Sequence, residues 1–94
     1  MLHITIGIQE LLADNRHFAL IIKHIAEAIT TETIMNDELL RDFQVWTVKD
    51  NYLYCQADKD EPQRFKMRTL FIPNLKFYCC FNGIGYTLML PEEY

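Results

Sequence analysis

The stretch Leu75-Lys-Phe-Tyr-Cys-Cys-Phe-Asn-Gly-Ile-Gly-Tyr-Thr-Leu-Met-Leu90 decides the fold class. Two runs of alternating side chains flank Asn82-Gly83, the dipeptide favoured by a two-residue type I′ hairpin turn. The resulting core-face pairs are Phe81–Ile84, Cys79–Tyr86, Phe77–Leu88 and Leu75–Leu90. Because all of these side chains are apolar or aromatic, we expect this face to lie on the core of an antiparallel sheet.

The preceding residues also alternate with a period of two. Asp50-Asn51 predicts a second hairpin, in which Val48 and Leu53 face inward, as do Trp46 and Cys55. The polar run 58–62 predicts an exposed loop. The expected strands are 44–49, 52–56, 64–72, 75–81 and 84–90. Linked in chain order by short turns, they would form a roughly five-stranded antiparallel meander.

Residues 1–43 are typical of helices. The main helix is indicated by apolar residues at spacings of three and four, with Asp14 or Asn15 as N-cap: Phe18, Ile21, Ile22, Ile25, Ala28 and Ile29. Residues 2–8 alternate like a short strand, but a short helix over 6–13 is favoured. A third helix is expected after Asn36 as cap, with Asp37 and Glu38 in its first turn and Leu39, Leu40 and Phe43 buried.

The 94 residues are therefore expected to form one α+β domain, 1–94. Within it, 1–43 would be mainly helical and 44–90 would form the antiparallel sheet. Two or three N-terminal helices can cover one face of such a sheet but hardly both. The other face would be left exposed to solvent.

Composition indicates a folded protein that works in the cytoplasm. Half of the chain is apolar, the net charge is −4, and no serine is present, which excludes serine hydrolases. The three cysteines are an odd number, unlike the spaced pairs of secreted domains. No signal-peptide pattern opens the chain, and the apolar runs 18–22 and 77–81 are too short to span a membrane.

No residue pattern predicts a cofactor, a metal or a catalytic residue. His17 and His24 are two helical turns apart, about 10 Å, which is too far for two ligands of one metal. Cys55 and Cys79 are expected in the core, where a thiol is inert, and Cys80 on the opposite face has nothing local to lower its pKa. The glycines match no phosphate-binding loop.

The uncovered sheet face is the first candidate site. Its tyrosine, arginine and methionine side chains are types enriched in protein interfaces. The residues predicted to bind a partner are Tyr54, Arg64, Lys66, Arg68, Tyr78 and Met89. Leu70 and Ile72 are expected on the same face. An acidic segment is the second choice, either as a contact surface or as a mimic of a phosphate row: Glu27, Glu32, Asp37, Glu38 and Asp42.

We therefore expect a non-catalytic protein-binding module that acts by direct contact. An inhibitor or adaptor fits best, and size and composition alone extend the class to immunity-type or anti-defence proteins encoded by phages or mobile elements. Self-association into a homodimer would use the same face. The alternative is binding of single-stranded nucleic acid, with bases stacked on Tyr54 and Tyr78 beside Arg64, Lys66, Arg68 and Lys76. The acidic net charge disfavours this alternative.

Overall fold

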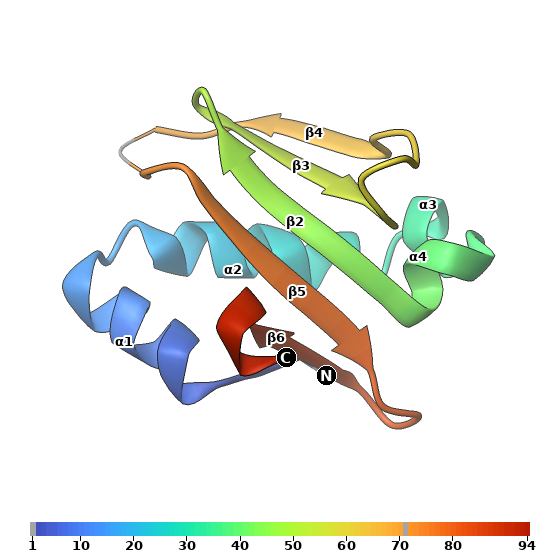
Figure 1. Cartoon of the computed structure of the whole chain (residues 1–94), viewed down its shortest axis with the longest axis horizontal. Coiled ribbons are helices and arrows are strands. Elements are labelled where there is room, and N and C mark those ends of the chain that lie inside the picture. The colour runs from blue at the N-terminus through green and yellow to red at the C-terminus, as the bar shows by residue number, and fades with distance from the viewer. Residues whose placement is uncertain (1, 71) are drawn as a thin grey trace.

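The computed structural model of the chain describes residues 2–70 and 72–94, in which six strands and four α-helices form an α+β fold (Figure 1). The strands are β1 (Leu2–Ile4), β2 (Phe43–Lys49), β3 (Tyr52–Gln56), β4 (Phe65–Arg68), β5 (Leu75–Phe81) and β6 (Tyr86–Met89). The helices are α1 (Ile6–Asp14), α2 (Phe18–Ala28), α3 (Glu32–Met35) and α4 (Glu38–Asp42), followed near the chain end by the 3₁₀ turn η1 (Pro91–Glu93). The predicted α+β class is confirmed.

The predicted meander is wrong, because the sheet is mixed and its strand order is β1-β6-β5-β2-β3-β4. β5 returns to pair with β2 rather than with β4, which sets Phe77 against Trp46 and Leu75 against Val48. These pairs lie on the core face and give the seven-residue strand β2 a partner on each side. β1 adds a sixth strand, parallel to β6.

The hairpin between β2 and β3 has the predicted register. Asp50 and Asn51 both take positive φ angles, 53° and 68°, as a two-residue type I′ turn requires. Trp46 lies opposite Cys55, and this pair is fully buried. Local turn chemistry therefore fixed this part of the sheet.

The hairpin between β5 and β6 is shifted by two residues from the predicted register, so that Phe81 pairs with Tyr86. The Asn82 side-chain oxygen accepts hydrogen bonds from the backbone N–H groups of Ile84 and Gly85, at 2.9 and 2.8 Å. These bonds hold Asn82 at the base of the turn instead of inside it. A shift of two preserves the faces, but Ile84 leaves the sheet and is 94% exposed.

One face of the sheet carries the core. Ile8 of α1 and the buried stripe of α2 pack against the inward side chains of the sheet, and Figure 1 shows α2 behind it. The predicted helices over 6–13 and from Phe18 are present, while Leu2–Ile4 forms a strand. His17 precedes α2, and its backbone N–H donates to the side chain of Asn15 at 3.0 Å.

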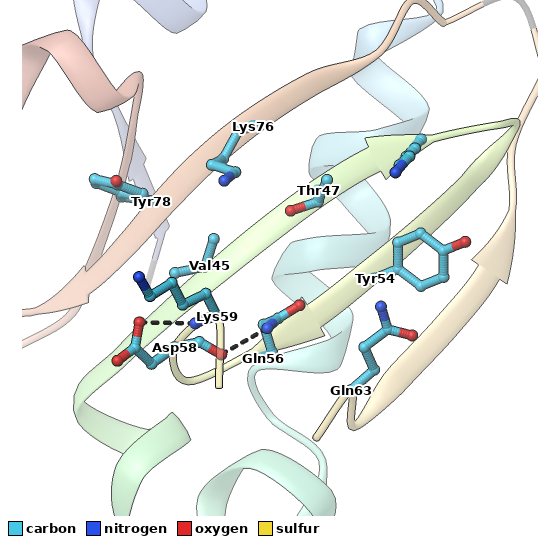
Figure 2. Close-up of a pocket in the computed structure, with 10 residues that line it drawn as sticks. Val45, Thr47, Tyr54, Gln56, Asp58, Lys59, Gln63, Lys76 and Tyr78 are labelled. Carbon is cyan, nitrogen blue, oxygen red and sulfur yellow. Dashed lines mark hydrogen bonds between the residues drawn. The ribbon is translucent and has the colours of Figure 1, made fainter. Parts of the chain in front are cut away.

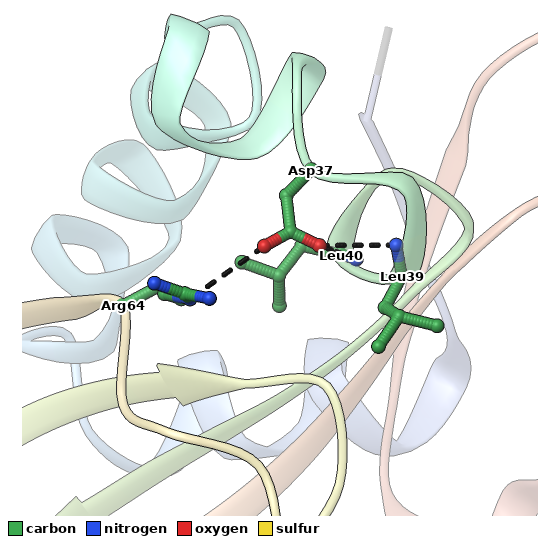
Figure 3. A network of polar contacts seen from close by, with 4 residues as sticks. All are labelled: Asp37, Leu39, Leu40 and Arg64. Atoms are coloured by element: carbon green, nitrogen blue, oxygen red, sulfur yellow. Dashed lines mark hydrogen bonds and ion pairs between the residues drawn. The ribbon is translucent and has the colours of Figure 1, made fainter.

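The third predicted helix begins one residue later than expected. Asp37, not Asn36, is the N-cap of α4, and its carboxylate accepts from the backbone N–H groups of Leu39 and Leu40 (Figure 3). Leu40 is buried, whereas Leu39 is 56% exposed, contrary to the prediction. Phe43 belongs to β2 and lies on its half-buried face.

The N-terminus of α1 is capped from the far end of the chain. The Glu93 carboxylate accepts hydrogen bonds from the Thr5 hydroxyl at 2.6 Å, the Leu90 amide at 2.9 Å and the Gly7 amide at 3.1 Å. The Thr5 bond comes first among the causes that hold the pKa of Glu93 below its ordinary value, followed by the Leu90 and Gly7 bonds. A Cβ on Gly7 would lie 2.6 Å from Glu93 Oε1, so this contact needs glycine.

Acid should therefore weaken the link between η1 and α1. Because folding lowers the pKa of Glu93, its contribution to stability is fully present above the ordinary carboxyl range and is lost as the pH falls through and below that range. Glu93→Gln should reduce the fall in melting temperature across this range, as should Gly7→Ala. Glu92→Gln is the matched control, and equal slopes for the wild type and all three variants would contradict the assignment.

Candidate functional site

The open face is the side of the sheet that faces away from α1 and α2. Alternation along β2 to β6 gives it Phe43, Val45, Thr47, Lys49, Tyr52, Tyr54, Gln56, Lys66, Arg68, Lys76, Tyr78, Cys80, Thr87 and Met89. Among these described strand positions, Lys49, Lys66, Arg68 and Lys76 are charged and none is a carboxylate. The open face is therefore cationic in a chain whose net charge is −4.

A hollow of about 470 Å³ lies on the open face (Figure 2). Its lining combines three lysines, two tyrosine rings and several neutral hydrogen-bonding side chains: Val45, Thr47, Lys49, Tyr54, Gln56, Asp58, Lys59, Gln63, Lys76 and Tyr78. Asp58 is the one carboxylate in this lining, and its Oδ1 accepts from the Lys59 backbone N–H at 2.7 Å. The hollow suits a partner group that carries negative charge.

Lys66 covers the tyrosines on β3. Its Nζ lies 4.5 Å from the ring centroid of Tyr52 and 5.8 Å from that of Tyr54. The two rings stack at 6.4 Å, and Lys66 pairs with Tyr54 across the β3–β4 ladder. A cation over aromatic faces stays held in place while its charge remains accessible.

The second aromatic group on the open face surrounds Tyr78. Its ring centroid lies 5.3 Å from that of Phe43 on β2 and 5.5 Å from that of Tyr94. Tyr94 also contacts Phe43, so the chain end packs onto this side of the sheet. Met89 pairs with Tyr78 on the neighbouring strand β6.

Arg64 was predicted to lie on the open face, but its side chain points toward α4 instead. Its Nε lies 3.6 Å from Oδ2 of Asp37, the N-cap residue of α4, and Figure 3 shows the guanidinium turned toward that helix. Tyr54, Lys66, Arg68, Tyr78 and Met89 do lie on the open face.

The segment after β4 also differs from the prediction. β4 ends at Arg68 instead of continuing to residue 72. Leu70 is exposed, but Ile72 is buried in the core, so the predicted alternation stops before these residues.

The predicted acidic segment is divided by the fold. Glu38 and Asp42 border a hollow of about 340 Å³ together with Leu39 and the loop carboxylates Asp58 and Glu61. Glu27 and Glu32, on α2 and α3, are not part of this lining. The Asp37 carboxylate is already engaged, because it caps the N-terminus of α4 and forms an ion pair with Arg64.

Cys55 and Cys79 are fully buried, and Cys80 is half-buried on the open face. Burial raises the pKa of all three thiols, that of Cys79 to about 12. At neutral pH they are therefore protonated and poor nucleophiles.

Across residues 2–70 and 72–94, no three His, Cys, Asp or Glu residues are placed to hold a metal ion. No helix in these ranges is long and apolar enough to cross a membrane.

Side-chain alternation predicted the open face but not all of the residues that form this face and line its hollow. Lys49 and Tyr52 follow from the hairpin register, since they pair with each other at the turn. Gln63 and Lys59 come from the loop before β4, whose path no local pattern predicts. The assembled surface offers cations, aromatic rings and amide groups, a set of side chains suited to binding. Comparison of the chain with protein-family models, with curated proteins and with solved structures finds no match.

Proposed function

We propose that the protein is a non-catalytic binding module whose open face docks on an acidic surface of a partner protein. The observation that carries this proposal is the charge of the face: its strand positions hold four cations and no carboxylate among the described residues. The tyrosines and Met89 beside these cations, together with Arg68 among them, match the composition of protein interfaces. An inhibitor or adaptor acts through such contacts alone.

Protonated, buried thiols support the non-catalytic part of the proposal. The proposal also includes a cytoplasmic location, where thiols stay reduced. The free cysteines Cys55, Cys79 and Cys80 support it.

A protein partner is favoured over single-stranded nucleic acid by the state of the tyrosines. Base stacking needs a free ring face. Lys66 lies over Tyr52 and Tyr54, and Tyr78 already contacts Phe43 and Tyr94. Carboxylates of a protein can bind the lysines without displacing these contacts.

Affinity capture with mass spectrometry tests the proposal. The wild type should retain a defined protein, and Lys76→Glu combined with Tyr78→Ala should weaken its retention roughly 10- to 100-fold, because like charges then face each other. Lys23→Glu, on the exposed side of α2, is the matched control and should retain the partner.

Three outcomes would contradict the proposal. Loss only on Glu38→Lys with Asp42→Lys would move the contact to the acidic hollow. Salt-sensitive binding of a single-stranded oligonucleotide would favour nucleic acid. A concentration-dependent dimer broken by the open-face variant would mean that a second copy occupies the face.

A further inference from the structure

β4 leaves one edge of the sheet without a strand partner in the described chain. The Thr69 backbone N–H donates to the Asn51 carbonyl at 2.7 Å, in the register of the β3–β4 ladder. Hydrogen-bonded pairs alternate along an antiparallel ladder, so odd-numbered residues of β4 bond to β3. The N–H and C=O groups of Lys66 and Arg68 therefore point outward, where a further strand could bond to them.

A groove of about 330 Å³ runs between this strand and α2. It is lined mainly by apolar surface from His17, Leu20, His24, Met67, Arg68, Thr69 and Leu70. Leu20 and Leu70 are more than half exposed, although both are large aliphatic side chains. Thr69 Oγ1, on the groove, is the buried side-chain oxygen in the described residues that has no hydrogen-bond partner.

We propose that β4 receives an extended segment of a partner protein as an additional strand, with alternating acidic and apolar side chains. Side chains of an added strand alternate between the two faces of the sheet. Those on the open face would lie beside the cations of Lys66 and Arg68. Those on the other face would enter the groove against Leu20 and Leu70. This edge site goes beyond the proposed function, which concerns the face of the sheet.

The positive charges of Lys66 and Arg68 favour an acidic partner segment over a second copy of this chain as the added strand. Antiparallel pairing of β4 with its own copy about Met67 would set Lys66 of each copy opposite Arg68 of the other. Like charges directly opposite on one face destabilise a strand pair, and edge lysines commonly prevent such self-pairing. A segment with glutamate or aspartate at these positions turns the repulsion into attraction.

Hydrogen exchange followed by NMR tests the edge site, with a synthetic peptide of alternating valine and glutamate as the probe. At peptide concentrations up to roughly 1 mM, the amide hydrogens of Lys66 and Arg68 should become at least tenfold slower to exchange. An N-methylated version of the peptide, which cannot pair along its edge, should give no protection. A valine–lysine peptide should bind at least tenfold more weakly.

Two substitutions at Lys66 separate the contribution of its backbone N–H from that of its side-chain charge. Lys66→Pro and Lys66→Thr both remove the charge, but only proline removes the outward N–H, which β3 does not use. The threonine variant should bind the peptide at least tenfold more tightly than the proline variant. Equal binding would overturn the proposal, as would absence of protection in the wild type. Protection that appears without peptide at high protein concentration would also overturn it, in favour of self-pairing. Lys66 and Arg68 also belong to the open face, but the test of that face varies Lys76 and Tyr78, so failure of the edge site is distinguishable from failure of the open-face proposal.

Discussion

Phe77→Ala should lower the free energy of unfolding by about 3–5 kcal/mol. Phe77 in β5 is 2% exposed, and its ring meets that of Phe18 edge to face, with centroids 5.7 Å apart. This contact ties α2 to the sheet. Removing the ring leaves a cavity between the two layers, and a domain of this size has only about 5–15 kcal/mol of stability to lose. Urea denaturation measures the change.

Tyr78→Ala is the matched control, because the next residue along β5 points to the open face. It should cost about 1–2 kcal/mol, mainly from contacts with Phe43 and Tyr94. If Phe77→Ala does not fold, Phe77→Leu should still unfold at lower urea than the wild type. Equal losses at positions 77 and 78 would contradict the assignment of the core to one face.

Gln44→Met should lower the free energy of unfolding by about 2–3 kcal/mol. Gln44 is fully buried, its Nε2 donates to the Leu40 carbonyl at 2.8 Å, and its Oε1 accepts from the Trp46 indole N–H at 2.9 Å. Methionine has nearly the same volume as glutamine, but it leaves the Leu40 carbonyl and the Trp46 indole N–H without their hydrogen-bond partner. The end of α4 would then lose its polar link to β2.

The fluorescence of Trp46, the only tryptophan, reports this unfolding transition. Gln56→Met is the control: this half-buried residue donates to the Asp58 carbonyl at 2.6 Å in a loop, where water can replace the bond. It should cost less than about 1 kcal/mol. A Gln44→Met protein as stable as the wild type would show that the buried network contributes nothing.

Local patterns predicted the elements that depend on neighbouring residues. The stripe of α2 and the turn at Asp50-Asn51 follow from side-chain spacing and turn preference. Asn36 and Asp37 are both good N-caps, so the start of α4 could not be decided from residue type. The return of β5 to β2 depends on pairing across the whole sheet, which no local pattern contains.

The same distinction holds for the candidate site. Alternation along the strands predicts that Tyr54, Lys66 and Tyr78 lie on one face, and the sheet register agrees. It could not place Arg64 beside Asp37, because that ion pair joins the end of the loop before β4 to a helix cap. The contact of Tyr94 with the open face also could not be predicted from local patterns, because it depends on the path of the chain after β6.

The ion pair also decides how the acidic alternative should be tested. Asp37→Lys would remove the cap of α4 and repel Arg64, so loss of binding would be confounded by damage to the fold. Glu38 and Asp42 are exposed and border the acidic hollow, so their reversal leaves the Asp37 cap and its ion pair with Arg64 in place. The two surfaces can therefore be compared with variants that leave the core intact.

Lysine footprinting of the captured complex identifies the docking surface most directly. The free protein and the complex are acetylated under limiting reagent, and the extent of modification is read by mass spectrometry. Docking on the open face predicts that Lys49, Lys66 and Lys76 lose reactivity in the complex while Lys23 on α2 keeps it. Protection of Lys23 with unchanged reactivity at Lys49 and Lys76 would show that the partner binds the helical side and that the open face is not the binding surface.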